Sequence, residues 1–260
     1  MAASTLKSLR AGVAKGAAPF ACLTCYDATT ARWLARAGVH VLLVGDTAAE
    51  VILGHTRTID MPMDIAVALT AAVKRGAPDC VVMADMPFMS YHADEPDAIR
   101  NAGRFLVEGH ADIVKLEVDE SFSPLITKLV RAGIPVCGHI GSRPQRAALT
   151  SGYTGAGRTE AEAQQIIRDA VAMQQAGCSM LLLEAVPDAV TAQVLAATSL
   201  PVIGIGAGNA CHGQVLVLHD LLGLTDNPPV FAKPLANLGA AIENAGREWV
   251  QSVANRAIKR

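Results

Sequence analysis

The stretch Val41-Leu42-Leu43-Val44-Gly45-Asp46-Thr47 decides the fold, because four large apolar residues end abruptly in a glycine, a carboxylate and a hydroxyl. A short apolar run bounded by turn residues predicts a strand that is buried on both faces, as in a parallel sheet. Four later runs end in a titratable residue in the same way: residues 81–85, 113–117, 136–139 and 181–184. Polar residues at the carboxyl ends of successive parallel strands are typical of an α/β barrel with its active site at that end.

The rest of the chain alternates between strand-like and helical stretches, which predicts βα units around a parallel sheet. Seven strands are expected to start near Phe20, Val41, Val81, Ile113, Val136, Leu181 and Val202, and the eighth is placed at residues 215–218. Only about a dozen residues separate the seventh strand from the eighth, and this connection is short for a crossover helix. The sequence therefore predicts a single-domain (β/α)8 TIM barrel over residues 1–260. A helix over residues 4–15 would cap its bottom, and a second helix over residues 235–258 would end the chain.

The bulk properties of the chain argue against nucleic acid and membranes as partners. A length of 260 residues is normal for one such barrel, and the formal net charge is −2 with no long run of one sign. No apolar segment is long enough to span a bilayer, and residues 1–15 lack the apolar core of a secretory signal, so we expect a cytoplasmic protein. Cys22 and Cys25 form a C-x-x-C, but on a strand they point to opposite faces, which favours buried reduced thiols over a metal site.

Two aspartates follow neighbouring predicted strands and are candidate metal ligands. Asp46 and Asp85 could share one cation, and oxygen ligands without His or Cys favour a hard ion, Mg²⁺ first. The alternative for each aspartate is a helix cap on the loop after its strand. Lys115 and Glu117 are harder to explain by capping, because they lie inside an apolar strand and point to the same side.

Glu184 is the candidate proton acceptor. It follows three leucines and precedes Ala185-Val186-Pro187, so we expect a poorly solvated carboxyl whose raised pKa makes it a base near neutral pH. The alternative is an ion pair inside the barrel, with Lys115 as the partner. His139 ends the fifth predicted strand. It is either a catalytic residue or a buried structural histidine. The glycines of residues 204–208 could hold a phosphate or could simply allow a tight barrel corner.

Eight short blocks carry a specific resemblance, in order, across almost the whole chain. They are residues 44–47 (VGDT), 75–78 (RGAP), 84–91 (ADMPFMSY), 114–117 (VKLE), 135–141 (PVCGHIG), 183–187 (LEAVP), 201–208 (PVIGIGAG) and 218–220 (LHD). The set resembles the ketopantoate hydroxymethyltransferase family. The resemblance implies a barrel of the phosphoenolpyruvate mutase and isocitrate lyase superfamily, assembled as a large homo-oligomer such as a decamer.

The resemblance also implies a reaction and roles for the candidate residues. A hydroxymethyl group would pass from 5,10-methylenetetrahydrofolate to 3-methyl-2-oxobutanoate through a Mg²⁺-stabilised enolate, giving 2-dehydropantoate for pantothenate synthesis. By resemblance, the metal residues are Asp46, Asp85 and Glu117, the substrate-binding residues are Asp46, Thr47, Asp85, Lys115 and His139, and the catalytic base is Glu184. The small-molecule partners would be the 2-oxo acid and the folate. This agrees with the chemistry read from the residues, because enolisation needs a Lewis acid on the carbonyl and a poised base.

The chain departs from the family's pattern in four loops near the expected site. Ala48-Ala49 stands where Leu-Gly is usual, Leu53-Gly54 where Gln-Gly is common, Ala68-Leu69-Thr70 where Tyr-His-Thr is common, and Val118-Asp119 where Gly-Gly is usual. We therefore expect any change from the family to concern substrate or folate preference.

Two other functions are compatible with the same candidate residues. One is a metal-dependent lyase that acts on a 2-oxo or 2-hydroxy acid, as elsewhere in the superfamily. Such lyases carry Cys-Gly-His in a mobile loop, whereas Cys137-Gly138-His139 here follows Pro135-Val136 and is predicted to be a strand. The other is a non-catalytic paralogue, which the retention of all the candidate residues disfavours.

Overall fold

Eight parallel strands close into a barrel in the part of the chain that the structure describes, residues 3–150 and 152–257 of a computed structural model. In chain order around the barrel they are β1 Phe20–Thr24, β2 Val41–Val44, β3 Val81–Asp85, β4 Ile113–Glu117, β5 Val136–Gly141, β6 Met180–Glu184, β7 Val202–Ile205 and β8 Gly213–Leu216. The predicted (β/α)8 barrel is confirmed. The chain divides into two compact units, Met1–Val215 and Leu216–Arg260, and a single domain over the whole length stays a prediction.

Alternate residues of the strands point into the barrel and form an interior core. Toward the amino ends of the strands this core is apolar, with members that include Val41, Val81, Met83, Ile113, Cys137, Met180 and Leu182. The other residues of each strand face a second core beneath the helices. Because strand side chains alternate, the inward-facing set continues along β3 to β6 into polar residues, namely Asp85, Lys115, Glu117, His139 and Glu184. The interior thus changes from an apolar floor to a polar mouth within the length of one strand.

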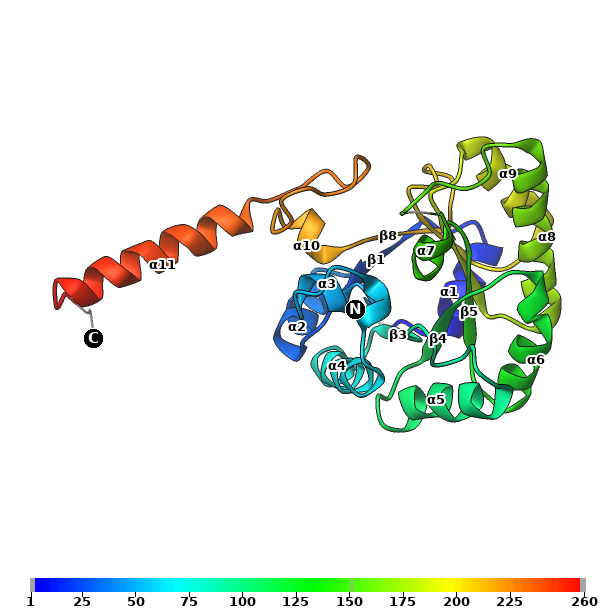
Figure 1. Ribbon diagram of the computed structural model, residues 1–260, viewed down its shortest axis with the longest axis horizontal. Helices are drawn as coiled ribbons and strands as arrows, with labels where there is room; N and C mark the ends of the chain where they lie inside the picture. Colours follow the sequence, from blue (N-terminus) through cyan, green and yellow to red (C-terminus); the bar gives the residue numbers. More distant parts are fainter. Residues whose placement is uncertain (1–2, 151, 258–260) are drawn as a thin grey trace. The chain divides into compact units, whose positions relative to one another are not determined.

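Helices surround the strands of the first unit (Figure 1). Neighbours in the ring pack side by side: α2 Ala28–Arg36, α4 Met63–Gly76, α5 Glu95–Val107, α6 Ser123–Arg131, α8 Glu160–Ala176 and α9 Asp188–Ala197. Short helical turns occupy the loops at the mouth: α3 Ala48–Val51, η1 Thr58–Asp60, η2 Glu120–Phe122, η3 Pro144–Arg146 and α7 Ala147–Thr150. Asp27 starts α2 as an N-cap, because its carboxylate accepts the backbone N–H groups of Thr29 and Thr30.

The predicted N-terminal helix is α1, Leu6–Ala14, and it closes the bottom of the barrel. Thr5 and Ser8 form a capping box at its start. Leu9 joins the interior core and Leu6 and Val13 pack against it, so the apolar face of the helix covers the amino ends of the strands. The cysteine prediction is also confirmed, because every cysteine in the described residues is buried and free, with Cys22 in the interior core and Cys25 in the outer one.

The end of the barrel differs from the prediction in its boundaries. The eighth strand begins at Gly213, two residues before the predicted start, because Gly213 and Gln214 pair with Ile203 and Gly204 of β7. It ends at Leu216, because Leu218 already begins the helix α10, Leu218–Leu221. No helix separates β7 from β8 in the described residues, which explains the short connection seen in the sequence.

The second unit contains α10 and the long helix α11, Leu238–Ala254. The side chain of Asn237 accepts the backbone N–H of Ala240 and starts α11 three residues later than predicted. The helix ends at Ala254, before the predicted end at residue 258, which itself lies outside the described residues. Among the helices of the described chain, none combines the length and the apolar character that a bilayer crossing requires.

Candidate active site

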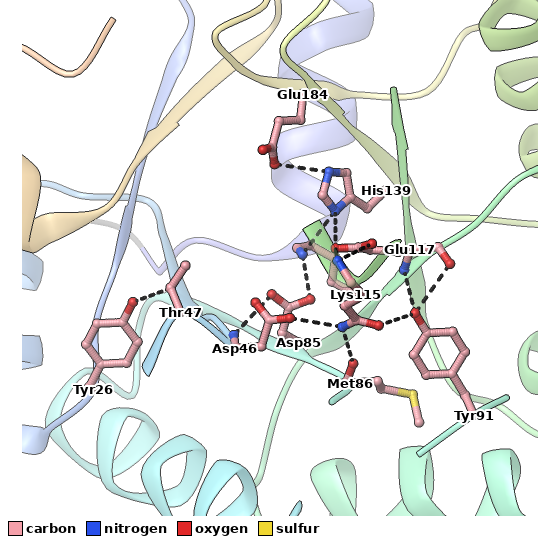
Figure 2. Close-up of polar contacts among 11 residues, drawn as sticks. Tyr26, Asp46, Thr47, Asp85, Met86, Tyr91, Lys115, Glu117, His139 and Glu184 are labelled. Atoms are coloured by element: carbon pink, nitrogen blue, oxygen red, sulfur yellow. Dashed lines mark hydrogen bonds and ion pairs between the residues drawn. The ribbon is translucent and has the colours of Figure 1, made fainter. Parts of the chain in front are cut away.

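The polar mouth brings most of the predicted site residues together. Strand register places Asp85 beside Lys115, Glu117 beside His139, and Gly141 beside Glu184. The side chains of Asp46, Asp85, Lys115, Glu117, His139 and Glu184 form one connected group (Figure 2). Thr47 lies at its edge, where its hydroxyl is 2.7 Å from the hydroxyl of Tyr26. The residues thus share one site, while their individual roles stay predictions.

Asp46 and Asp85 lie next to each other at the ends of neighbouring strands. Both are buried, and the backbone N–H of Asp46 donates to Oδ2 of Asp85 at 3.3 Å. Neither caps a helix, because the N-caps of α3 and α5 are Thr47 and Asp94, so the capping alternative is wrong for both. Lys115 Nζ lies 2.5 Å from Oδ1 of Asp85.

The site holds more buried carboxyl groups than buried cationic groups. Burial raises the pKa of Asp85, the charge of Asp46 raises it further, and Lys115 only partly opposes this. Burial likewise raises the pKa of Glu117 to about 9, again with partial opposition from Lys115. Burial alone would lower the pKa of Lys115, but the carboxylates of Asp85, Asp46 and Glu117 raise it overall, so the ammonium stays charged. Three buried carboxyls share this single ammonium, and a divalent cation would supply the missing charge.

The oxygen donors of Asp46 and Asp85 fit a hard cation such as Mg²⁺. No group of three His, Cys, Asp or Glu side chains converges as metal ligands within the described residues. Two carboxylates are sufficient for Mg²⁺, because this ion commonly takes one or two from the protein and the rest of its ligands from water and substrate. Both oxygens of Glu117 accept the backbone N–H of Gln145, at 3.0 and 3.2 Å, and direct ligation by Glu117 stays a prediction.

His139 connects Lys115 to Glu184. Its Nδ1 lies 3.3 Å from Lys115 Nζ, and its Nε2 lies 3.2 Å from Oε2 of Glu184. An ammonium can only donate, so Nδ1 is the acceptor and the single proton of a neutral imidazole lies on Nε2, facing Glu184. Burial and the charge of Lys115 lower the pKa of His139, which keeps the ring neutral. The contacts therefore assign one tautomer to His139, with the Nε2 proton on the side of Glu184.

Glu184 is more open than the sequence suggested. Its side chain is 22% exposed, because it is the last residue of β6 and lies above the apolar interior, so the expectation of a poorly solvated carboxyl is wrong. The alternative of an ion pair with Lys115 is also wrong, since the partner is His139. A carboxylate that is oriented on one side and open on the other can accept a proton from a molecule in the mouth.

The backbone on both sides of Glu184 is tightly constrained. Gly141 of β5 has a φ of +90°, and a Cβ there would lie 2.6 Å from the carbonyl oxygen of Glu184. Ser142 N–H donates to that same oxygen at 2.9 Å. Ala185 adopts a φ of +49°, which is uncommon for a residue with a Cβ, and its carbonyl accepts the N–H of Ala156. These main-chain contacts therefore fix the backbone at Glu184 and with it the direction of its side chain.

Tyr91 and Gln145 belong to the site but were missed in the sequence. Tyr91 lies in the loop after β3, and its buried hydroxyl contacts the backbone of Glu117 and Oε1 of Gln145. Gln145 lies in η3 and reaches Asp46 and Met86. Tyr91 stands inside one of the blocks that carry the family resemblance, which was the available signal, whereas no local pattern marks Gln145.

Several departures from the family pattern are buried residues of the outer core. Ala48, Ala49 and Val118 are fully buried in the outer core. Asp119 instead accepts hydrogen bonds from Arg143 at 2.7 Å and Arg146 at 3.1 Å. In the glycine-rich stretch, a Cβ on Gly208 would lie 2.4 Å from the carboxylate of Asp188, so close packing accounts for this glycine.

A cavity of about 350 Å³ lies beside the end of β5. Its lining includes Gly141, Arg143, Arg146, Tyr153 and Glu162. Because Gly141 pairs with Glu184, the cavity adjoins the strand end that carries the candidate base. Its volume lies within the range of small-molecule sites.

Comparison with known proteins identifies a family over nearly the whole chain. The sequence profile of the family described as "Ketopantoate hydroxymethyltransferase" matches residues 3–258. A 3-methyl-2-oxobutanoate hydroxymethyltransferase of Pyrobaculum neutrophilum is 45% identical over 240 residues, which cover 92% of each chain. One from Halorhodospira halophila is 41% identical and covers 96% of this chain and 90% of its own. Among solved structures, 2,3-dimethylmalate lyase, a member of the PEP mutase/isocitrate lyase superfamily, aligns with a TM-score of 0.64 at 18% identity, covering 99% of this chain and 88% of its own, which shows a common fold.

Proposed function

The chain belongs to the ketopantoate hydroxymethyltransferase family and is a hydroxymethyltransferase, and on this premise we propose that it converts 3-methyl-2-oxobutanoate to 2-dehydropantoate with 5,10-methylenetetrahydrofolate as the donor. In this reaction the methylene carbon of the donor and one water become the hydroxymethyl group on C3, and tetrahydrofolate leaves. The observation that carries the proposal is the juxtaposition of an aspartate pair suited to a divalent cation with an oriented, open carboxylate at the same barrel mouth.

We propose Asp46 and Asp85 as the residues that hold Mg²⁺. The oxygen-only donor set and the excess of buried carboxyl groups around Lys115 support this assignment. When bound, the ion would act as a Lewis acid on the 2-oxo group and so make the C3 proton more acidic. Lys115 would stay charged near the 2-oxo acid and partly balance the negative charge that develops on deprotonation.

Glu184 is the proposed base. Its carboxylate takes the proton from C3, and the electrons of the broken C–H bond move into the bond between C2 and C3. The Nε2 proton of His139 faces Oε2 of Glu184 during this step, because the neutral ring accepts at its other nitrogen. Carbon C3 then bonds to the methylene carbon of the donor, the two bonds from that carbon to the folate nitrogens break, and a water supplies the hydroxyl group. The other proton of the water and the proton held by Glu184 go to the two nitrogens of the departing tetrahydrofolate. Thr47, at the edge of the site, is a proposed contact of the substrate.

The cavity beside β5 supports a second substrate of some size. Arg143 and Arg146 line it together with Glu162, and their guanidinium groups suit the carboxylates of the anionic folate donor. We also propose, by family likeness, a large homo-oligomer in the cytoplasm.

The lyase alternative is disfavoured by the position of Cys137-Gly138-His139. These residues lie within β5 and are buried, so they do not form a loop at the mouth. The His139 ring instead faces Lys115 and Glu184.

Deuterium exchange at C3 of 3-methyl-2-oxobutanoate, followed by NMR, tests the proposal. Wild type should exchange C3 in the presence of Mg²⁺ and should form 2-dehydropantoate once the folate donor is added. Glu184→Gln should lower the exchange rate by about 10²- to 10⁴-fold, because it removes a general base. The control is Glu108→Gln, which changes an exposed carboxylate after the end of α5 and should leave exchange unchanged. No exchange by folded, Mg²⁺-supplied wild type would refute this substrate.

A further inference from the structure

Gln145 forms hydrogen bonds with several residues of the site, although the sequence did not predict it as a site residue. It is 3% exposed and lies in the short turn η3, which follows β5. Its side-chain Nε2 donates to Oδ2 of Asp46 and to the carbonyl of Met86, both at 3.0 Å. Its Oε1 accepts the hydroxyl of Tyr91 at 2.8 Å, and its backbone N–H donates to both oxygens of Glu117. One residue thus connects the carboxyl ends of β2, β3 and β4.

The orientation of this amide is fixed by its surroundings. Both protons on Nε2 have acceptors, and the one amide oxygen has a donor. A flipped amide would turn its oxygen toward a carboxylate and a carbonyl, which can only accept, and would leave these three acceptors facing one another. Because every group of the buried amide is satisfied in only one orientation, it holds the Asp46 carboxylate at a defined rotation.

The turn that carries Gln145 is itself anchored on both sides. Pro144 begins η3 and restricts its backbone. Arg143, just before the turn, and Arg146, its last residue, both donate to Asp119, two residues after Glu117. The turn is therefore held over the end of β4, and Gln145 cannot withdraw from the site without breaking these ion pairs.

We propose that Gln145 is a positioning residue of the metal site: it holds the carboxylates of Asp46 and Glu117 in the orientation in which the cation binds. The inference rests on the proposed function, because it takes Mg²⁺ to bind at Asp46 and Asp85. Carboxylates that ligate a metal are commonly hydrogen-bonded by such outer partners, and loss of a partner typically lowers metal affinity 10- to 100-fold.

The test is metal binding by the full chain without substrate, measured for Mg²⁺ and Ca²⁺ by calorimetry and for Mn²⁺ by electron paramagnetic resonance. Gln145→Met keeps the length of the side chain but removes its donors and its acceptor. We expect its Mg²⁺ affinity to fall about 10- to 100-fold. Its Ca²⁺ affinity should fall less, because Ca²⁺ tolerates irregular ligand geometry whereas Mg²⁺ requires a near-octahedral one. The ratio of the two affinities is a readout that partial unfolding would not change.

A matched control comes from Gln174 on α8. Its Oε1 accepts hydrogen bonds from Thr198 and Ser199, outside the residues of the site. Gln174→Met should lower thermal stability and leave the ratio of Mg²⁺ to Ca²⁺ affinity at the wild-type value.

Excess Mg²⁺ should restore the kcat of Gln145→Met.

Each outcome of the experiment decides a separate point. Wild type that binds no Mg²⁺ would refute the metal assignment and this inference with it. Wild-type binding with an unchanged affinity ratio in Gln145→Met would overturn the inference alone, and so would an equal change of the ratio in Gln174→Met. If Gln145→Met does not fold, Tyr91→Phe replaces it, because this variant removes the donor that orients the amide. A lowered ratio in Tyr91→Phe would then support the inference, and an unchanged ratio would overturn it.

Discussion

Lys115→Met is the substitution for which the structure predicts the largest loss of stability in the site. The Lys115 ammonium is 2.5 Å from Oδ1 of Asp85 and 3.3 Å from Nδ1 of His139, and the side chain is 5% exposed. Methionine fills a similar volume but has no charge. The substitution therefore leaves the buried carboxyls of Asp46, Asp85 and Glu117 without an ammonium.

Removal of one partner of a buried ion pair costs about 3–5 kcal/mol. For a chain of this size each kcal/mol lowers the melting temperature by about 2–4 °C, so we expect Lys115→Met to melt about 6–20 °C below wild type. The control is Lys74→Met, which removes a half-buried pair in which Lys74 Nζ lies 2.7 Å from Asp112. Because this pair is only partly buried, we expect the control to lose less stability than Lys115→Met.

The assay is thermal unfolding of metal-free protein, followed by circular dichroism, and the same measurement in saturating Mg²⁺. A cation bound at Asp46 and Asp85 would supply the charge that Lys115→Met removes. The Mg²⁺-induced rise in melting temperature should therefore be larger in Lys115→Met than in wild type or in Lys74→Met. If Lys115→Met loses no more stability than Lys74→Met, the electrostatic reasoning about the mouth is wrong.

Two further substitutions test the loop and the backbone beside the site. Burial alone would raise the pKa of Asp119, but hydrogen bonds from Ser121 and Arg143 lower it overall, so its carboxylate stabilises the fold above the ordinary aspartate pKa and loses this contribution as pH falls. Asp119→Asn should thus cost about 1 kcal/mol near neutral pH. The difference from wild type in urea unfolding should begin to shrink below about pH 4, the ordinary aspartate pKa, and disappear as pH falls through the lowered pKa of Asp119; a difference that stays constant with falling pH would contradict this. Gly141→Ala should lower stability by at least about 1–2 kcal/mol, because its φ of +90° and the nearby carbonyl oxygen of Glu184 leave no room for a Cβ, whereas wild-type stability in this variant would show that the turn can relax.

The barrel and the core of the site could be predicted because they depend on strand periodicity. A strand places alternate side chains on one face, so the spacing of Lys115 and Glu117 requires that both point into the barrel if either does. By the same rule, Asp85 points to the same side as Met83, and Glu184 points to the same side as Leu182. The closure of eight such strands then brings residues that are far apart in the sequence to one mouth. Neither step needs information beyond the local pattern of each strand.

The contacts made by loops could not be predicted in this way. Gln145 reaches Asp46 across 99 positions of sequence, through a turn whose path depends on Asp119 and its two arginines. Residues in such turns follow no period, so nothing in the local sequence indicates which side chain enters the site. The exposure of Glu184 was misjudged for a related reason. Its three preceding leucines suggested burial, but the last residue of a strand lies at the rim, where the loops decide how much solvent remains.

Lys115 gives the site a property that neither the metal residues nor the base has alone. Its ammonium contacts Asp85 on one side and Nδ1 of His139 on the other. The first contact offsets part of the carboxylate charge around the proposed metal position. The second requires His139 to carry its proton on Nε2, which lies 3.2 Å from Oε2 of Glu184. A charged His139 would stabilise the carboxylate of Glu184 and so make this proposed base weaker. The ammonium beside the ring opposes that charge. Because one side chain sets both conditions, the metal side and the base side of the mouth are electrostatically coupled through Lys115.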